Sequence, residues 1–350
     1  MDSYGVVDAL DGSKPGLDLI KPRALRPGDL LGVVAPAGPP DEAALDRGIR
    51  RLGELGFTVR LGRHVRSNTG YLAGSDEERL TDLLDMFADP TVKGIVCARG
   101  GYGSLRLVPR LDPDVIRRNP KVFVGYSDIT ALHIAFSQKT GLVTFHGPMV
   151  ASDFGREPSS SDAPSLQTSN PLSNSFTEGS FVKAVTEPRP LGTIRNPAQA
   201  PKILTIAPGM ASGPVTGGNL SLVVATLGSP FEIDLRGKIL ILEETGEEPY
   251  RVDRMLTQLI ITGKLKHVSG LIFGEIPHPI LSENSEKHTG RAGPSIEDVL
   301  LERLCPLNIP CFYGLAVGHG LEKATVPLGV RATMDAEEGF LRIDEAATVP

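Results

Sequence analysis

Ser127 has the residue type and the setting of a catalytic nucleophile. It follows an apolar strand predicted at 121–125 and precedes a helix predicted to run to about Ser137. At such a corner the N-terminus of the helix directs unbonded N–H groups and a favourable dipole at an oxyanion. Two interpretations remain open from this motif alone. Serine also caps helices, and Ile129 stands where the hydrolase motif Gly-x-Ser-x-Gly requires glycine.

Acyl transfer also requires amide donors at the position where the oxyanion forms. The backbone N–H of Asp128 directly follows the candidate nucleophile, and Gly101 in a glycine-rich loop could supply a second donor. This loop does not match a dinucleotide-binding pattern, because Arg106 occupies the position of the third glycine, and the chain has no Walker A lysine pattern. The glycines therefore favour a close approach of backbone to a ligand rather than phosphate binding.

A serine is a weak nucleophile unless a base activates it. His146 and His319 both follow apolar strands and precede glycine, so either could face a cleft, and the residues alone do not choose between them. Glu243 directly follows four aliphatic residues, where a carboxylate needs partners, and it could orient a histidine. The alternative for Glu243 is an ion pair with Arg251 or Arg254.

Strands and helices alternate through the first part of the chain and must position these residues. Apolar runs predict five strands, and helical spacing between them predicts helices, one of which begins with a capping box at Ser75. This alternation is typical of a parallel sheet with helices on both faces, which binds ligands at the carboxyl ends of its strands. Three loops that follow strands are therefore candidates for a site: 35–40, 98–104 and 125–128.

Composition divides the chain into four segments. We expect a loose leader at 1–20, an N-terminal α/β domain with the candidate nucleophile at 21–154, a Ser- and Pro-rich linker or insertion at 155–207, and a C-terminal domain at 208–350. Further strands and helices are predicted in the last segment, among them the apolar strand that ends at Glu243.

Composition also argues against several classes of protein. A hydrophobic content of 40%, a charged content of 22% and a net charge of −6 are ordinary for a soluble globular protein. A basic stripe and tryptophan are both absent, which argues against a nucleic-acid partner. We expect the three cysteines, Cys97, Cys305 and Cys311, in a reduced interior. The sequence shows no signal peptide and no run of about 20 apolar residues, so it predicts a cytoplasmic protein without a membrane partner.

Seven stretches, in the same order along the chain, resemble the LD-carboxypeptidases of the S66 serine peptidase family. They read GVVAPAGPP, ARGGYGSLRLVPRLD, FVGYSDITALH, TFHGPM, GGNLSLVVATLGSP, LEETGEEPYRVDRML and GLAVGHGLEKATVPLG. That family includes murein tetrapeptide carboxypeptidases and microcin C self-immunity peptidases. The similarity extends from about Leu25 to Ile343.

The resemblance implies a flavodoxin-like parallel-sheet N-terminal domain plus a smaller β-rich α/β C-terminal domain, with the site between them in a homodimer. It also implies a catalytic triad, in which Ser127 is the nucleophile, His319 the base and Glu243 the acid that orients the base. The backbone amides of Gly101 and Asp128 would form the oxyanion hole.

The activity implied is that of a serine carboxypeptidase that cleaves the L,D bond of a muropeptide tetrapeptide and releases terminal D-alanine. Its partner would be a small peptide substrate, with no metal or organic cofactor. Arg99, Tyr102 and Asn219 are candidates to hold polar groups of that substrate. The alternatives are an immunity-type peptidase that cleaves a peptidyl-nucleotide amide, and an inactive ligand-binding protein on the same fold. Glu244 stands where the family often has aspartate, and we expect it to be a solvated loop charge.

Overall fold

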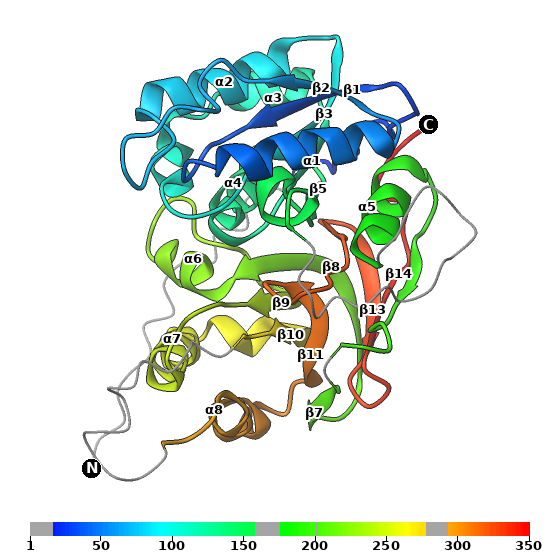
Figure 1. The fold of residues 1–350 in the computed structure, drawn as a ribbon. Coiled ribbons are helices and arrows are strands. Elements are labelled where there is room, and N and C mark those ends of the chain that lie inside the picture. The colour runs from blue at the N-terminus through cyan, green and yellow to red at the C-terminus, as the bar shows by residue number, and fades with distance from the viewer. Residues whose placement is uncertain (1–16, 158–175, 201, 278–292) are drawn as a thin grey trace.

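The computed structural model describes residues 17–157, 176–200, 202–277 and 293–350. In Figure 1 the part of the chain that comes first in sequence, with its sheet and helices, occupies the upper half, and a second sheet with its own helices lies below it. None of the helices in these ranges is long and apolar enough to cross a bilayer.

The first sheet has six strands in the order β12-β5-β4-β3-β1-β2. Strands β1 to β5 are all parallel, and their order 2-1-3-4-5 is that of flavodoxin-like folds. Strand β12 comes from much later in the chain and pairs antiparallel with β5 at the edge. The predicted parallel sheet is thus confirmed. The strands are β1 Leu30–Val34, β2 Thr58–Leu61, β3 Val92–Cys97, β4 Val122–Gly125, β5 Thr144–His146 and β12 Val326–Leu328.

Helices cover both faces of this sheet. Helix α1 packs on one face, and α2, α3 and α4 pack on the other. Ser75 begins α2 with the predicted capping box, in which its side chain and that of Glu78 each bond the other's backbone N–H. Helix α4 ends at Gly141, whose φ of 75° is left-handed. The helices are α1 Glu42–Glu54, α2 Asp76–Ala88, α3 Pro113–Arg118 and α4 Thr130–Thr140.

The second sheet has eight strands in the order β6-β14-β13-β8-β9-β10-β11-β7. Its middle strands, β8 to β11, are parallel, and the strands outside them pair antiparallel. The strands are β6 Gly192–Ile194, β7 Leu204–Ala207, β8 Met210–Asn219, β9 Ile239–Glu243, β10 Gly270–Glu275, β11 Cys311–Gly318, β13 Arg331–Asp335 and β14 Phe340–Ile343.

The two sheets share a hydrophobic core. Helices α6 Leu220–Ala225, α7 Pro249–Ile261 and α8 Ile296–Leu304 pack with one face of the second sheet. A different cluster runs from Val124 and Phe145 of the first sheet to Ile241 and Val317 of the second. Each fully buried side chain of this size contributes about 1.5–3 kcal/mol to stability, so the shared cluster holds the carboxyl ends of β4, β9 and β11 in fixed relation.

Part of the segment expected as a linker has regular structure. Helix α5, Phe176–Thr186, and strands β6 and β7 fall within 155–207, and the Ser-rich stretch 158–175 lies outside the described residues. Ile20, at the end of the expected leader, is hydrogen-bonded to the end of α4. Its N–H donates to the carbonyl of Gly141 at 2.8 Å.

Candidate active site

Ser127 occupies a strained turn at the carboxyl end of β4. The strand ends at Gly125, Tyr126 is extended, and Ser127 has a φ of 63°, in the left-handed region that residues other than glycine rarely adopt. A short 3-10 turn, Ser127–Ile129, then leads into α4. Within the described residues the Ser127 side chain caps no helix, so the capping interpretation is not supported. Such a backbone conformation costs about 1–3 kcal/mol and is concentrated at functional sites.

The glycine loop that follows β3 lies directly against this turn. A Cβ atom on Gly100 would lie 2.9 Å from the Cβ of Ser127 and 3.4 Å from the amide nitrogen of Asp128, so only glycine fits. Asp128 is buried and accepts a 2.8 Å hydrogen bond from the amide of Ser104, and the Ser104 hydroxyl donates to the Asp128 carbonyl. These bonds fix the loop to the turn. The backbone of Gly100 and the Asp128 amide therefore lie beside the Ser127 side chain.

Glu243 and His319 form a hydrogen-bonded pair where β9 and β11 end. Nδ1 of His319 donates to Oε2 of Glu243 at 2.5 Å, and Glu243 is fully buried while the His319 side chain is 18% exposed. Burial by itself raises the pKa of Glu243, but the neighbouring His319 and His146 outweigh burial and lower it to about 2. Burial also works to lower the pKa of His319, but the Glu243 carboxylate raises it above 6.5. Glu243 is therefore an anion that orients the imidazole and favours its protonated form.

The ion-pair partners of Glu243 among the described residues are histidines, and a glycine lies against its side chain. A Cβ atom on Gly318 would lie 2.6 Å from the Cβ of Glu243, so the end of β11 approaches the carboxylate closely only because this residue is glycine. In the described part of the chain Glu243 forms no ion pair with Arg251 or Arg254; Arg251 pairs instead with Glu247 at 3.5 Å. The arginine alternative for Glu243 is thus not supported.

The Tyr126 ring connects the serine turn with both candidate bases. Its centroid lies 5.0 Å from that of His319 and 5.9 Å from that of His146. The residue that precedes Ser127 thus contacts the imidazole that Glu243 orients. Within the described residues the Ser127 hydroxyl makes no hydrogen bond to His319.

His146 lies against the other oxygen of Glu243. Its Nε2 is 3.9 Å from Oε1, which is beyond hydrogen-bond distance. Neither of these two buried atoms has a hydrogen-bond partner among the described residues. Both histidines that the sequence left as alternatives therefore approach the carboxylate, but only His319 is hydrogen-bonded to it.

Arg99 and Tyr102 are exposed on the glycine loop. The guanidinium of Arg99 donates to the carbonyl of Gly100 at 3.2 Å and to that of Pro39 at 3.4 Å. The Tyr102 ring packs edge-on against Tyr71, with the centroids 5.5 Å apart. Gly100, which directly follows Arg99 in the loop, lies against the serine turn.

Asn219, the third candidate for substrate binding, is buried and engaged within the protein. Its Oδ1 accepts from the amide of Leu222 at 3.2 Å and caps α6, and its Nδ2 donates to Glu244 at 2.9 Å. Its own amide donates to the hydroxyl of Thr130, in the first turn of α4, at 2.9 Å. Asn219 thus links the second sheet to the helix that follows Ser127.

The expectation that Glu244 is a solvated loop charge was wrong. The side chain is only 4% exposed, and it also accepts from the amide and hydroxyl of Ser221, at 2.9 and 2.7 Å, and from the amide of Thr245. Burial raises its pKa. A sequence signal existed for this, because successive side chains at a strand end point to opposite faces, which directs Glu244 away from Glu243 and toward α6.

The described residues show no reactive cysteine and no acidic cluster that would add a second site. Cys97 and Cys311 are buried and burial raises the pKa of both thiols, which keeps them protonated and unreactive. Cys305, expected in the interior, is exposed because it lies at the C-terminal end of α8. Among the residues that the structure describes, no three His, Cys, Asp or Glu side chains converge as metal ligands.

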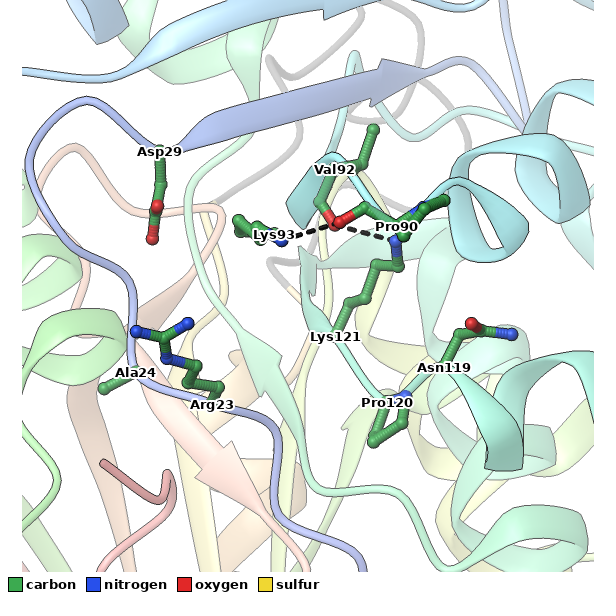
Figure 2. Close-up of a pocket in the computed structure, with 9 residues that line it drawn as sticks. All are labelled: Arg23, Ala24, Asp29, Pro90, Val92, Lys93, Asn119, Pro120 and Lys121. Carbon is green, nitrogen blue, oxygen red and sulfur yellow. Dashed lines mark hydrogen bonds between the residues drawn. The ribbon is translucent and has the colours of Figure 1, made fainter.

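A separate pocket lies at the opposite end of the first sheet, where β3 and β4 begin (Figure 2). There the ammonium of Lys121 donates to the carbonyl of Val92 at 2.7 Å and to that of Asp89, and Lys93 donates to the carbonyl of Pro90. Burial lowers the pKa of Lys121 to about 8. This pocket contains none of the candidate catalytic residues.

Comparison with known proteins gives consistent matches over both sheets. Residues 31–147 match the LD-carboxypeptidase N-terminal domain, and residues 212–334 match the LD-carboxypeptidase C-terminal domain. A probable murein peptide carboxypeptidase of Bacillus subtilis is 42% identical over 318 residues, which are 91% of this chain and 92% of the relative.

Solved structures match at similar coverage. MccF in complex with glutamyl sulfamoyl guanosine superposes with a TM-score of 0.80 at 26% identity, covering 94% of this chain and 99% of that one. The muramoyltetrapeptide carboxypeptidase from Oxalobacter formigenes superposes with a TM-score of 0.74 at 30% identity, covering 92% of this chain and all of that one.

Proposed function

The chain belongs to the LD-carboxypeptidase family, and from this premise we propose a serine carboxypeptidase that hydrolyses an L,D-peptide bond of a muropeptide tetrapeptide and releases the C-terminal D-amino acid. Relatives named murein peptide carboxypeptidase and muramoyltetrapeptide carboxypeptidase support this substrate class. The observation that carries the proposed mechanism is the hydrogen bond of Glu243 to His319, beside a strained turn that holds Ser127.

Acylation begins at Ser127. Its Oγ attacks the carbonyl carbon of the scissile bond, and its proton passes to Nε2 of His319. Glu243 accepts the Nδ1–H of His319 and stabilises the imidazolium that forms. The amides of Gly101 and Asp128 donate to the carbonyl oxygen as it becomes negative. The contact between hydroxyl and imidazole forms when substrate is bound, since catalytic hydrogen bonds commonly tighten only in the complex.

Breakdown and deacylation return the enzyme to its starting state. The C–N bond breaks while His319 gives its proton to the leaving amine, so the D-amino acid departs and an ester remains on Ser127. His319 then takes a proton from water as the water oxygen adds to the ester carbonyl. The ester C–O bond breaks and Ser127 regains the proton from His319. The scheme uses no metal or organic cofactor.

Arg99 supplies a positive group for the terminal carboxylate that a carboxypeptidase must recognise. It is exposed, and its hydrogen bonds in the described residues go to backbone carbonyls, so the positive charge is available to a substrate. A guanidinium binds a carboxylate through two parallel hydrogen bonds, which lysine cannot reproduce. In this proposal Arg99 binds the substrate carboxylate, Tyr102 borders it, and Asn219 positions the surrounding backbone from within.

Active-site labelling tests the proposal directly. We expect a fluorophosphonate probe to label the unaltered protein and not Ser127→Ala, and Ser137→Ala, which removes another serine hydroxyl nearby in α4, to be labelled normally. Mass spectrometry should show an L,D-linked tetrapeptide losing one D-alanine with the unaltered protein and with Ser137→Ala, but not with Ser127→Ala. Labelling of neither protein would contradict the mechanism and favour a ligand-binding protein on the same fold.

A peptidyl-nucleotide amide is the second candidate substrate. Two observations favour it: the MccF structure bound to glutamyl sulfamoyl guanosine superposes over nearly the whole chain, and Tyr71 and Tyr102 expose aromatic rings beside the glycine loop. Stacking of a base on such a ring contributes about 1–3 kcal/mol. Parallel digestion of the tetrapeptide and of a peptidyl-adenylate analogue distinguishes the two substrates by their relative kcat/KM.

The same proposal includes a homodimer in the cytoplasm. Family resemblance supports the dimer, and the reduced cysteines and ordinary charge of the sequence support the compartment. Light scattering of the purified protein at several concentrations tests the assembly, and fractionation of the source cells tests the location. A monomer at micromolar concentration would contradict the first.

A further inference from the structure

The buried oxygen of Glu243 that does not bind His319 lies next to a second buried polar atom that also lacks a partner. Oε1 of Glu243 and Nε2 of His146 are 3.9 Å apart, and neither makes a hydrogen bond within the described residues. An unpaired buried donor or acceptor is costly, and most such atoms in folded proteins are bonded. The separation of Oε1 and Nε2 exceeds the upper end of the usual N–H···O range by about 0.7 Å.

The sheet holds His146 in place to make this contact. It is the last residue of β5, it pairs with Gly125 of β4 on one side and with Val326 of β12 on the other, and its side chain is 3% exposed. The His319 side chain, by contrast, is 18% exposed. The two histidines therefore differ in exposure: His319 is partly open to solvent, and His146 lies in the interior against Glu243 and the Tyr126 ring.

We propose that His146 is a positioning residue that donates its Nε2–H to Oε1 of Glu243 and so holds the carboxylate in register for His319. The inference rests on the proposed mechanism, in which Glu243 orients His319 as the base. With both oxygens bonded, the carboxylate cannot rotate away from Nδ1 of His319. His146 touches neither substrate nor the reacting atoms and acts only through Glu243.

The bond also affects the protonation of the base. When His319 is neutral, Glu243 is a buried anion without a positive neighbour in hydrogen-bond contact, and the donor on His146 stabilises that state most. Removing the donor therefore favours protonated His319 and moves the acidic limb of the activity profile to higher pH.

Other charged and titratable groups face the same cluster. Glu244 also raises the pKa of His319, and the buried Lys323 lowers it. The Tyr126 ring contacts both imidazoles, and burial, Asp153 and Glu243 together raise the pKa of its phenol. A substitution at His146 leaves these groups unchanged. A shift of the acidic limb in the variant therefore reports the loss of the Nε2–H donor of His146.

A pair of substitutions tests the donor itself. His146→Gln keeps an N–H near the position of Nε2, and His146→Leu removes it. We expect kcat to fall about 10- to 100-fold in His146→Leu with KM little changed, and the acidic limb of kcat/KM to move to higher pH. His146→Gln should recover most of the lost kcat and restore the limb. The matched control is His64→Gln, which alters a histidine–carboxylate pair outside the site and should leave both readouts unchanged.

The outcomes separate the two proposals. If the unaltered protein is labelled at Ser127 but His146→Leu retains its kcat and its pH limb, the role of His146 is overturned and the mechanism stands. If Ser127 is not labelled at all, both are overturned. If His146→Leu does not fold, ¹⁵N NMR of the unaltered protein decides. A proton on Nε2 of His146 would support its role as a hydrogen-bond donor, and an unprotonated Nε2 would contradict that role.

Discussion

Two histidine–carboxylate pairs in this chain have nearly the same composition but differ in how many of their carboxylate oxygens accept a hydrogen bond. Asp82, on α2, accepts from Nδ1 of His64 at 2.9 Å on one oxygen and from the His64 amide at 2.8 Å on the other. Glu243 accepts a 2.5 Å hydrogen bond from His319 on one oxygen, and its other oxygen has no hydrogen-bond partner in the described residues. Both carboxylates are buried, and both lie against a glycine, Gly62 or Gly318, whose Cβ would overlap them.

The difference indicates which pair is structural. Asp82 has a donor for each oxygen and joins the loop after β2 to α2, so its interactions are complete without a ligand. Glu243 is left with unused hydrogen-bonding capacity next to an imidazole whose charge must change during a reaction. In the proposed mechanism the Glu243 pair stabilises that charge as it develops, and only interactions that strengthen in the transition state accelerate a reaction.

Exchanging the carboxylate at Glu243 for an amide should produce the largest effect. In Glu243→Gln the side chain keeps its shape but no longer stabilises the His319 imidazolium, so we expect kcat to fall about 10³- to 10⁴-fold with little change in the melting temperature. Steady-state kinetics and thermal unfolding measure the two quantities. Activity within a few-fold of the unaltered enzyme would show that Glu243 is not the orienting acid.

The same exchange of a carboxylate for an amide at Asp82 should lower stability and leave activity unchanged. In Asp82→Asn an NH₂ group faces a donor of His64, so we expect the free energy of unfolding to fall by about 1–3 kcal/mol while kcat is unchanged. Urea unfolding followed by circular dichroism gives the stability. A stability-neutral variant with reduced kcat would reverse the assignment of the two pairs.

Loosening the helix that carries Asp82 should have a smaller effect. Ser75→Ala removes the capping box of α2, which should cost about 1 kcal/mol of stability without altering kcat/KM. Urea unfolding and the kinetic assay again provide the readout. A loss of activity at equal stability would mean that α2 contributes to the site.

The smallest expected effect is on the pH dependence near neutrality. The pKa of His319 is raised above 6.5, and only the deprotonated imidazole accepts the proton of Ser127. Activity should therefore rise with pH through the raised pKa, and at pH 6.5 kcat/KM should lie below half of its plateau value. Glu243, with a pKa of about 2, stays ionised throughout. An acidic limb of kcat/KM centred at or below pH 6.5 would contradict the effect of the Glu243 carboxylate on the pKa of His319.

The sequence predicted the elements of the first sheet well because strand and helix periodicities are local. It also located the capping box at Ser75 and the loops at the carboxyl ends of the strands. The left-handed φ of Ser127 could not be read from residue types, since the glycine loop that packs against this turn comes from another part of the chain. The choice between His146 and His319 depends on which one hydrogen-bonds Glu243, a contact that only the packing of the two sheets determines.

The position of β12 has a consequence for how the enzyme is made. This strand follows His319 in the chain by a few residues, yet it forms the edge of the sheet that bears Ser127. Until Leu328 has been synthesised, β5 presents unpaired backbone at that edge, and a fragment that stops at residue 154 should aggregate through it. Completion of the early sheet and synthesis of His319, the proposed base, are therefore nearly simultaneous, so we expect a nascent polypeptide to lack hydrolase activity until both have been made.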